Sequence, residues 1–391
     1  MSSPRPERKD LIAVPLIGLL RTFAIALVSP YLGLALYRKG MPLAYVGAAY
    51  LALAAVGALG QLFGGSASDA LGRRPVMIMS QVASGLFLVL MGLSFELRGY
   101  SAFLAFSFLQ TFFGSANMAA FNAYVGDAGG TSAEMVRGYS RMRVGINIGW
   151  AVGPLAGGVL IGLLGFELAW MISGGFVMAS SVAFLMLSGG RSVSSGIDLR
   201  AAADPGYLLR ISPFVIFYAF VAQFGLTLTI YETVMRGVPV AGYGLVYLLN
   251  GLIVATLQMP MSKLFAGKDI NRWIVAGTAF YMAGFITYAL GGLPYALAGT
   301  FILTLGENIA FPLAMTYANI HAKSERRGSY LGVFGMITGF SRSLGSLIGS
   351  LLLSWLSQPL LIWGGVDLLG ALFLVYFYLI AYALKEKGTP G

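Results

Sequence analysis

Four charged side chains lie inside long apolar stretches of the sequence, and they are the residues best placed to do chemistry. They are Arg21, Glu307, Arg342 and Asp367. A charge in the hydrocarbon core of a membrane costs roughly 2.5–3.5 kcal/mol on insertion scales, so such residues are candidates for ion or proton pathways. Their formal charges cancel. Static ion pairing is therefore the alternative explanation, above all for Arg342 and Asp367.

Glu307 and Arg21 are the pair we expect to handle protons. Each lies about ten residues from the end of its apolar stretch, or roughly 15 Å along a helix. A carboxylate in a dry cavity is driven toward its protonated form by desolvation and toward its ionised form by a nearby guanidinium. Opening such a cavity to water on alternate sides would change that balance. We expect Glu307 to carry the proton, with Arg21 tuning it or holding an anionic group of a substrate.

Membrane helices must position these charges. The chain is 58% hydrophobic and 10% charged, with a mean hydropathy of +0.80, whereas soluble domains are about a quarter charged. Apolar runs of about 20 residues can cross a bilayer as helices, and the alternation expected of barrel strands is not seen. The sequence predicts an all-α polytopic membrane protein with twelve spans. They are 11–36, 44–63, 76–95, 101–125, 140–164, 168–187, 211–235, 243–264, 273–291, 295–317, 329–356 and 360–384.

The net charge of +10 follows the expected topology. With twelve spans both termini share one side of the membrane, and 19 of the 25 Lys and Arg residues lie on that side. The positive-inside rule makes that side cytoplasmic. We expect a multi-pass protein in the cell (plasma) membrane of a prokaryote, with a basic excess that attracts anionic lipids rather than nucleic acid.

Cysteine is absent and His321 is the single histidine. This excludes disulfides, thiol chemistry and a histidine-rich metal site. The chain also lacks the GxxxxGK(S/T) loop that cradles phosphates. We expect no metal, no cofactor and no enzyme activity, because the spans hold no nucleophile–base pair.

A ten-residue segment between the second and third spans combines glycines with an acid and two arginines. It reads Gly65-Ser-Ala-Ser-Asp69-Ala-Leu-Gly72-Arg73-Arg74. It resembles the signature loop between helices two and three of major facilitator superfamily transporters, which reads Gly-x-x-x-Asp-(Arg/Lys)-x-Gly-(Arg/Lys)-(Arg/Lys). Five positions match, and Ala70 stands where the family has a basic residue. The resemblance covers roughly residues 10–385.

The resemblance implies a cytoplasmic latch that biases the inward/outward equilibrium, formed by Gly65, Asp69, Gly72, Arg73 and Arg74. In the family the acid approaches the start of helix eleven, here Gly328-Ser329, where the helix end favours an anion. Arg73 and Arg74 would then lie at the lipid headgroups or pair with Asp127 or Glu134.

The resemblance also implies two pseudo-symmetric six-helix bundles, the major facilitator fold. The expected bundles are residues 1–187 and 211–391, joined by a cytoplasmic linker over 188–210. An internal repeat agrees with a duplication, because Gly153-Pro-Leu-Ala-Gly-Gly158 in span five corresponds to Gly345-Ser-Leu-Ile-Gly-Ser350 in span eleven. A central site between two halves is typical of such transporters.

Span five carries the segment Gly149-Trp-Ala-Val-Gly153-Pro154-Leu-Ala-Gly157-Gly158. Glycines four residues apart make a ridge that lets another helix approach closely, and Pro154 kinks the helix. The segment is similar to the span-five motif typical of twelve-helix drug–proton antiporters in this superfamily, where the ridge packs against helix eight and helps close the outer side. It favours antiport and export, although related Gly-Pro patterns occur in other branches.

Family helices one, four, seven and ten line the central cavity. The polar and aromatic candidates on them are Phe23, Gln110, Phe113, Asn117, Tyr218, Gln223, Tyr231 and Asn308. Each is also explained as a helix-packing residue, but together they suit an amphipathic organic substrate better than an inorganic ion. Many proton-coupled antiporters have an arginine where this chain has Gln110, four residues before Gly114, and Arg21 is the candidate to replace it. Glu232, near the outer end of span seven, is expected to be a rim charge.

These features predict a secondary active transporter, with a proton-coupled exporter of small amphipathic compounds as the leading interpretation. The alternative is an importer or exchanger of an organic anion, with Arg21 and Arg342 as anion ligands. A channel and a membrane-embedded enzyme are the competing classes. The expected partners are a small-molecule substrate, protons and membrane lipids, and the family resemblance implies a monomer.

Overall fold

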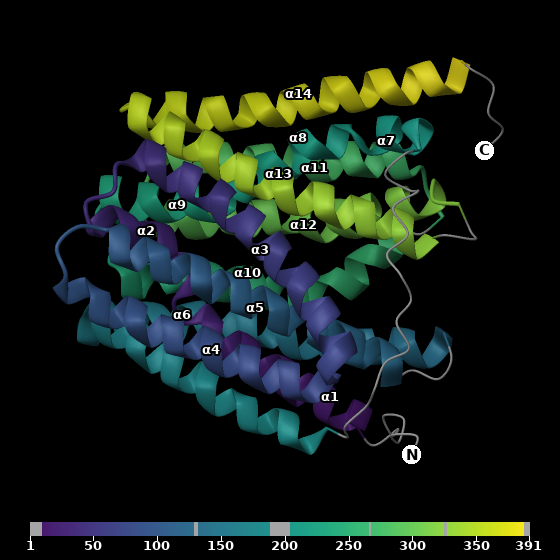
Figure 1. Cartoon of the computed structure of the whole chain (residues 1–391). Helices are drawn as coiled ribbons and strands as arrows, with labels where there is room; N and C mark the ends of the chain where they lie inside the picture. The colour runs from purple at the N-terminus through teal and green to yellow at the C-terminus, as the bar shows by residue number, and fades with distance from the viewer. Residues whose placement is uncertain (1–9, 129–131, 188–203, 266, 324–326, 387–391) are drawn as a thin grey trace. The chain divides into compact units, whose positions relative to one another are not determined.

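The computed structural model describes residues 10–128, 132–187, 204–265, 267–323 and 327–386. Every regular element among these residues is helical (Figure 1). The α-helices are α1 Asp10–Ala26, α2 Leu32–Arg38, α3 Leu43–Leu71, α4 Arg73–Leu93, α5 Ser101–Ala128, α6 Ser132–Ser180, α7 Pro205–Ile211, α8 Pro213–Val221, α9 Leu226–Ile230, α10 Val240–Phe265, α11 Ile270–Thr287, α12 Leu293–Ile320, α13 Arg327–Trp355 and α14 Pro359–Glu386. Short helical turns are η1 Ser29–Tyr31, η2 Ser94–Glu96, η3 Ser181–Met186, η5 Ala222–Phe224, η6 Tyr231–Met235 and η7 Tyr288–Leu290.

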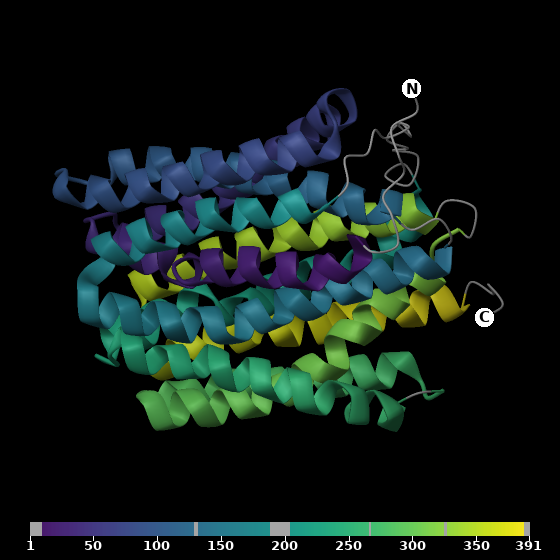
Figure 2. The ribbon, with the colours of Figure 1, turned by 90° about the horizontal axis from the view of Figure 1, so that it is seen from below.

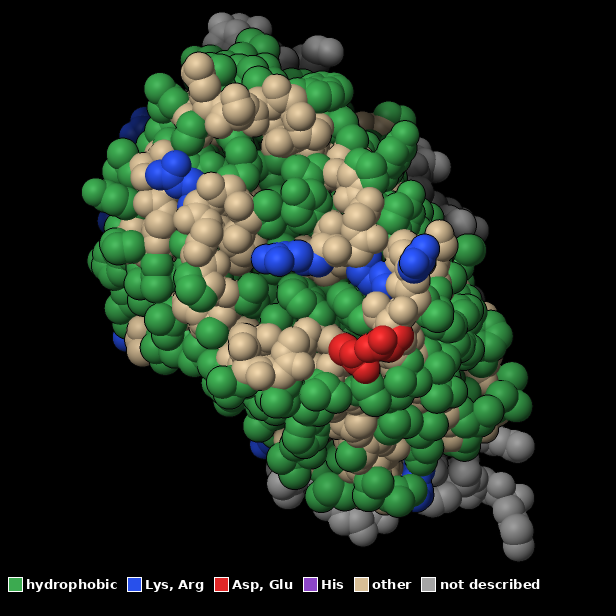
Figure 3. Space-filling view, turned by 90° about the vertical axis from the view of Figure 1, so that its left-hand side faces the viewer, with side chains coloured by type: hydrophobic (Ala, Val, Ile, Leu, Met, Phe, Trp, Pro, Cys, Tyr) green, Lys and Arg blue, Asp and Glu red, His purple; other side chains and the backbone are tan. Residues whose placement is uncertain are grey.

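Ten helical segments of the described residues are long and apolar enough to cross a membrane. One of them, Gly138–Met186, has 49 residues and is broken at Gly165, where φ is 80°. The 28-residue helix α5 is not among the ten. Large hydrophobic side chains are exposed on most helices, and Figure 3 shows one face on which hydrophobic side chains predominate and charged ones are few. The all-helical membrane fold is confirmed, and the count of twelve stays a prediction.

The described chain divides into two compact units. Unit 1 comprises the described residues within 1–42, 52–195 and 239–251, and unit 2 those within 43–51, 196–238 and 252–391. In unit 1, α1 and α4 pack along α6, and in unit 2, α11 and α12 lie side by side (Figure 2). The first part of α10 therefore belongs with the N-terminal helices, and the first part of α3 with the C-terminal ones. The linker residues 188–203 lie outside the described residues.

The two predicted repeat segments have equivalent neighbours. Glycine 157 on α6 allows no Cβ because the carbonyl of Leu27, at the end of the first helical segment of unit 1, lies against it. Glycine 345 on α13 is likewise closed by the carbonyl of Ala219 on α8, the main first helix of unit 2. Each repeat thus packs on the first span of its own half. This correspondence agrees with a duplicated origin.

Two predicted helices and one predicted loop need correction. The first span is interrupted at Ser29–Tyr31, where Pro30 ends α1's hydrogen-bonding pattern. The seventh span, expected as one helix over 211–235, is four consecutive helical segments ending in a π-helical turn. The expected glycine-rich loop at 65–74 is mostly helix, because α3 continues to Leu71 and only Gly72, with φ 95°, separates it from α4.

Candidate functional site

An arginine stacked on two aromatic rings forms the centre of the candidate site in unit 2. The guanidinium carbon of Arg342, on α13, lies 5.0 Å from the ring centroid of Tyr218 on α8 and 5.2 Å from that of Phe311 on α12. The two rings stack with their centroids 5.7 Å apart and an interplanar angle of 9°. The negative face of an aromatic ring attracts a cation within about 6 Å of its centroid. Three helices therefore meet in one cation–π cluster.

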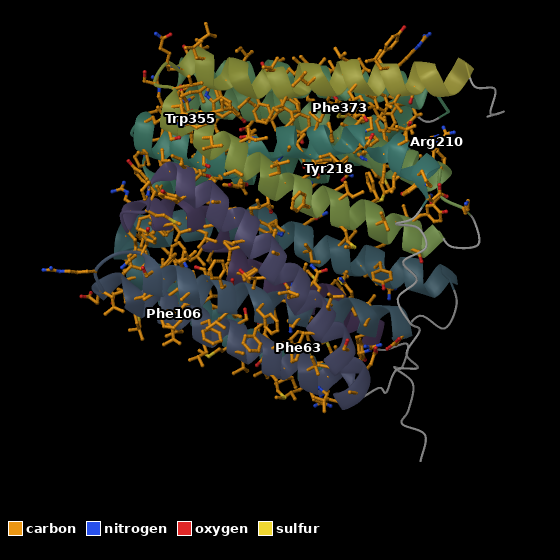
Figure 4. All side chains as sticks on the ribbon, turned by 45° about the horizontal axis from the view of Figure 1, so that its top comes forward. Phe63, Phe106, Arg210, Tyr218, Trp355 and Phe373 are labelled. Atoms are coloured by element: carbon orange, nitrogen blue, oxygen red, sulfur yellow. The ribbon has the colours of Figure 1, made fainter. Side chains whose placement is uncertain are left out.

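The cluster lies near the middle of the helix that carries its arginine. Arg342 lies near the middle of α13, about 20 Å from either end at 1.5 Å per residue, and it is exposed. Figure 4 shows Tyr218 between Trp355, near one end of unit 2, and Arg210, near the other. An exposed guanidinium at mid-depth of a membrane is costly in lipid and faces water or polar groups instead.

Glu307 borders the same cluster. It lies four residues before Phe311 on α12, so the two side chains share one helix face. Tyr281 on α11 is 2% exposed and lies within electrostatic reach of both Glu307 and Arg342. Glu307 was predicted to act with Arg21, whereas Tyr281 connects it electrostatically with Arg342 within unit 2. A carboxyl, a guanidinium and stacked aromatic rings therefore occur together within unit 2.

The static ion pair considered for Arg342 and Asp367 is absent from the described residues. Arg342 stacks on aromatic rings instead. Asp367, on α14, has one buried carboxyl oxygen that makes no hydrogen bond. Since Asp367 is not neutralised by Arg342, it remains a candidate proton-binding residue.

Arg21 is held within unit 1 by hydrogen bonds to the fourth span. Its Nε donates to Oδ1 of Asn117 at 2.6 Å and its Nη2 donates to the carbonyl of Gly114 at 3.3 Å. Gln110, one turn before that glycine, donates instead to Ser84 Oγ at 3.2 Å. The guanidinium of Arg21 thus reaches the helix on which the family resemblance places an arginine. This geometry agrees with Arg21 as the replacement for that residue.

Two predicted cavity residues, Gln223 and Asn117, are used in buried contacts between helices. Gln223 donates from Nε2 to the carbonyl oxygens of Ala219 and Gly345, at 2.9 and 2.8 Å. Asn117 donates to the carbonyl of Met77 at 2.7 Å in addition to accepting from Arg21. These amides satisfy buried backbone groups in this conformation, which is the packing role considered in the sequence analysis.

The remaining predicted cavity residues fall in different surroundings. Tyr231 is 0% exposed and packs edge-on against Trp363, with ring centroids 5.3 Å apart. Asn308 is buried, and its Oδ1 makes no hydrogen bond. Phe113 stacks on Phe87 at 5.7 Å within unit 1. Only Tyr218 of the predicted set belongs to the Arg342 cluster.

An apolar groove in unit 1 has a volume of about 460 Å³. Phe23 and Leu27 of α1 line it together with residues of α6 on both sides of Gly165. No charged side chain of the described residues lines it. The predicted cavity residue Phe23 therefore faces a purely hydrophobic surface.

The acid and arginine of the signature segment form an ion-pair chain in unit 1. Arg73 Nη1 lies 2.6 Å from Asp69 Oδ1, and its Nε lies 2.9 Å from Asp127 Oδ2. Arg73 is 6% exposed and also donates to Ser68. Of the two expected surroundings for Arg73, pairing with Asp127 is the one observed. The expected approach of Asp69 to the start of α13 stays a prediction, and the side chain of Glu134 lies outside the described residues.

The glycine ridge of span five faces a different helix from the expected one. A Cβ at Gly149 or Gly153 would meet α1, as at Gly157. Gly158 instead lies against the backbone of Val240 on α10, and the hydroxyl of Tyr31 donates to the carbonyl of Pro154 at 2.6 Å. The ridge therefore packs on the first span, and the adjacent face of α6 meets the eighth.

Two polar groups were missed or misjudged from sequence. The expectation that Glu232 is a rim charge is wrong, because its side chain is 0% exposed.

Asp204, the N-cap of α7, accepts from Tyr330 Oη at 2.6 Å and pairs with Lys323 Nζ at 2.9 Å. These hydrogen bonds hold the pKa of the Asp204 carboxyl well below its usual range. The Asp204-Pro205 pair is a recognisable helix start, but its tertiary partners leave no local signal.

A family model of the Major Facilitator Superfamily matches residues 16–346. The chain belongs to the Major Facilitator Superfamily. A relative is the uncharacterized MFS-type transporter YttB of Bacillus subtilis (strain 168), which is 25% identical over 283 residues, covering 67% of this chain and 68% of that protein. The protein is thus a multi-pass membrane transporter.

Solved structures share the fold of this MFS chain at low identity. A POT family transporter in complex with a thioalcohol-conjugated peptide has a TM-score of 0.77 at 12% identity, with 97% of each chain covered. The nucleoside transporter NupG has a TM-score of 0.73 at 14% identity, with 94% of this chain and 98% of that chain covered. These similarities show that the chain shares the fold of these proteins, and they carry no substrate assignment.

Proposed function

We propose that this MFS protein exports a small amphipathic organic compound by alternating access, driven by proton entry through Glu307. The supporting observation is the placement of Glu307 beside the Arg342–Tyr218–Phe311 cluster near the middle of α12 and α13. Aromatic faces bind planar apolar groups, and a carboxyl that gains or loses a proton changes the charge next to them. Substrate and proton can then compete for one site.

The drug–proton antiporter assignment, and with it multidrug efflux, rests on the span-five segment. Its glycines bring α1 and α10 close to α6, which suits a helix pair that closes one end of a cavity. As part of this proposal, the protein works as a monomer in the plasma membrane with both termini cytoplasmic. Arg73, Asp69 and Asp127 supply the latch that stabilises one conformation.

Transport in proteoliposomes tests this proposal. Ethidium serves as the amphipathic cationic probe, and a pH gradient is imposed in each direction. We expect ethidium to accumulate on the acidic side and to be accompanied by proton movement the other way. Ethidium transport that does not depend on the direction of the pH gradient would contradict the proposal.

Carriage of an organic anion is the second candidate, favoured by the exposed guanidinium of Arg342. Arginine recognises carboxylates through paired N–H groups, and its ring stacking leaves those groups available to a ligand. Benzoate is the corresponding probe. Benzoate transport that Arg342→Ala abolishes, together with no ethidium transport, would select this function over the first.

A further inference from the structure

Glu232 occupies an unusual position in unit 2. It lies in the π-helical turn η6, Tyr231–Met235, that ends the seventh span, and its side chain is 0% exposed. π-Helical turns are rare and are found frequently at functional sites. Neither the family resemblance nor the proposed function uses this residue.

The two carboxyl oxygens of Glu232 have different hydrogen-bonding surroundings. Oε2 accepts the backbone N–H of Gly292 at 3.0 Å, whereas Oε1 is buried and makes no hydrogen bond. An ionised carboxylate has about four acceptor positions to satisfy, and a buried charge without a paired cation is strongly unfavourable. A neutral carboxylic acid leaves far less unsatisfied. The surroundings therefore suit the protonated form.

A cation that interacts with Glu232 is bonded to another group. Arg236, four residues further on, donates from Nη2 to the carbonyl of Leu290 at 2.8 Å, and its guanidinium carbon lies 5.9 Å from the ring centroid of Tyr231. It crosses Gly291 so closely that a Cβ there would collide with the guanidinium. No ion pair joins Arg236 to Glu232 within the part of the chain that the structure describes.

Two side chains of the same helical turn region act on the charge of Glu232. Tyr231 and Arg236 both have an electrostatic interaction with it in the described part of the chain. From the η7–α12 turn, Gly292 faces it with a backbone N–H only. Arg236 is therefore the available partner for an ionised Glu232.

We propose that Glu232 is a second proton-binding site, protonated in this conformation, whose deprotonation draws Arg236 from the Leu290 carbonyl to the carboxylate. The turn over residues 290–292 then has two arrangements. In one, the turn is fastened to η6 through Arg236 and Leu290. In the other, Glu232 and Arg236 pair with each other and the Leu290 carbonyl is released. This site lies outside the Arg342 cluster and does not depend on Glu307 or on the identity of the substrate.

Infrared difference spectroscopy of the purified full-length protein tests the proposal. The carbonyl stretch of a protonated carboxyl is followed from acid to alkaline pH in lipid nanodiscs. Glu232→Gln is nearly isosteric and keeps an oxygen for the Gly292 N–H, so it should fold. We expect it to lack a protonated-carboxyl band that Asp367→Asn and Glu307→Gln both retain. Retention of every such band in Glu232→Gln would overturn the proposal.

A second variant tests the exchange of partners. Arg236→Gln removes the cation that would stabilise ionised Glu232, so the Glu232 band should persist to higher pH than in the unaltered protein. The matched control is Arg98→Gln, a change of another arginine outside the spans, and it should leave the band unmoved. If Arg236→Gln leaves the pH dependence of the Glu232 band unchanged, the role of Arg236 is refuted. This outcome can be read even if the Glu232→Gln variant is unstable.

Discussion

Units 1 and 2 both bring helices together through glycines, and unit 2 also surrounds its helix α8 with aromatic rings. In unit 1 the helices approach through glycines, as where Gly85 and Gly174 bring α4 against the backbone of α6. In unit 2, Gly284 and Gly299 bring α11 against α12 in the same way, and Phe214 and Phe217 of α8 also contact rings on α12, α13 and α14. Backbone-to-backbone packing leaves little space for movable polar groups. Aromatic faces can also bind a cation, as Tyr218 and Phe311 do with Arg342.

The distribution of charge follows the same division. Glu232, Glu307 and Asp367 all lie in unit 2 within candidate membrane spans, together with Arg342. In unit 1 the intramembrane Arg21 is held by an amide and a carbonyl, and the Arg73 ion pairs lie at helix ends. We infer that unit 2 carries the proton chemistry and unit 1 supplies a rigid framework.

The largest effect is expected from closing a helix contact in unit 1. Gly157→Ala places a methyl group against the Leu27 carbonyl, and we expect a loss of about 3 kcal/mol or failure to fold, as for severe overpacking. The matched control is Gly175→Ala on the same α6, where a Cβ meets nothing within 4 Å. Thermal unfolding in detergent measures both. Equal stability of the two variants would contradict glycine-dependent packing.

Removing an aromatic face from unit 2 should impair transport more than the same change in unit 1. Tyr218→Leu removes the ring that stacks on Phe311 and under Arg342, and we expect ethidium export to fall about tenfold, the equivalent of roughly 1.4 kcal/mol. Tyr218→Phe keeps the ring and should keep transport. Phe23→Leu in the groove of unit 1 is the comparison, and a larger loss there would reverse the assignment of the two units.

A substitution at Asp204 tests how much its contacts with Tyr330 and Lys323 stabilise the start of α7 in unit 2. Asp204→Ala removes an N-cap and the bonds from Tyr330 and Lys323, so we expect a loss of about 2 kcal/mol. Because the folded pKa of Asp204 is lowered, its contribution is complete above the unfolded value of about 3.9 and is lost as the pH falls through the folded one. The cost of Asp204→Ala should therefore be constant near neutral pH and shrink only in strong acid. A cost that grows on acidification would contradict this sign.

The smallest change in stability is expected at the latch of unit 1. Asp69 is one-third exposed, and Arg73 keeps Asp127 when Asp69 is neutralised. Asp69→Asn should cost less than about 1 kcal/mol in stability yet lower turnover, because the latch acts on the conformational equilibrium. Unchanged turnover in a stable Asp69→Asn variant would remove Asp69 from the latch.

The sequence predicted features that depend on the length of apolar runs and on residue spacing. It missed features that depend on which residues meet in the tertiary structure. Apolar length identified the membrane helices, and the spaced glycines of span five identified a close helix contact. Which helix they contact was not readable, since every helix offers a similar apolar surface. Sequence spacing likewise could not tell that Gly72 alone would break the helix at the signature segment.

The candidate site was only partly predictable for the same reason. Charge inside an apolar span marked Arg342 and Glu307, but the rings near them lie on other helices that are distant in the sequence. Arg342 stacks on rings of α8 and α12, and Tyr281 of α11 interacts electrostatically with both charges. Glu232 was judged by its distance from the span end. Its burial comes from the η7–α12 turn, whose Gly292 N–H faces it.

Proton-coupled transport by Glu307→Gln in proteoliposomes tests the central claim most directly. Two activities of ethidium are compared in one preparation: exchange across a membrane without a pH gradient, and accumulation driven by one. If unit 2 carries the proton through Glu307, exchange should persist and gradient-driven accumulation should be lost. Accumulation at the full rate of the unaltered protein would contradict the account.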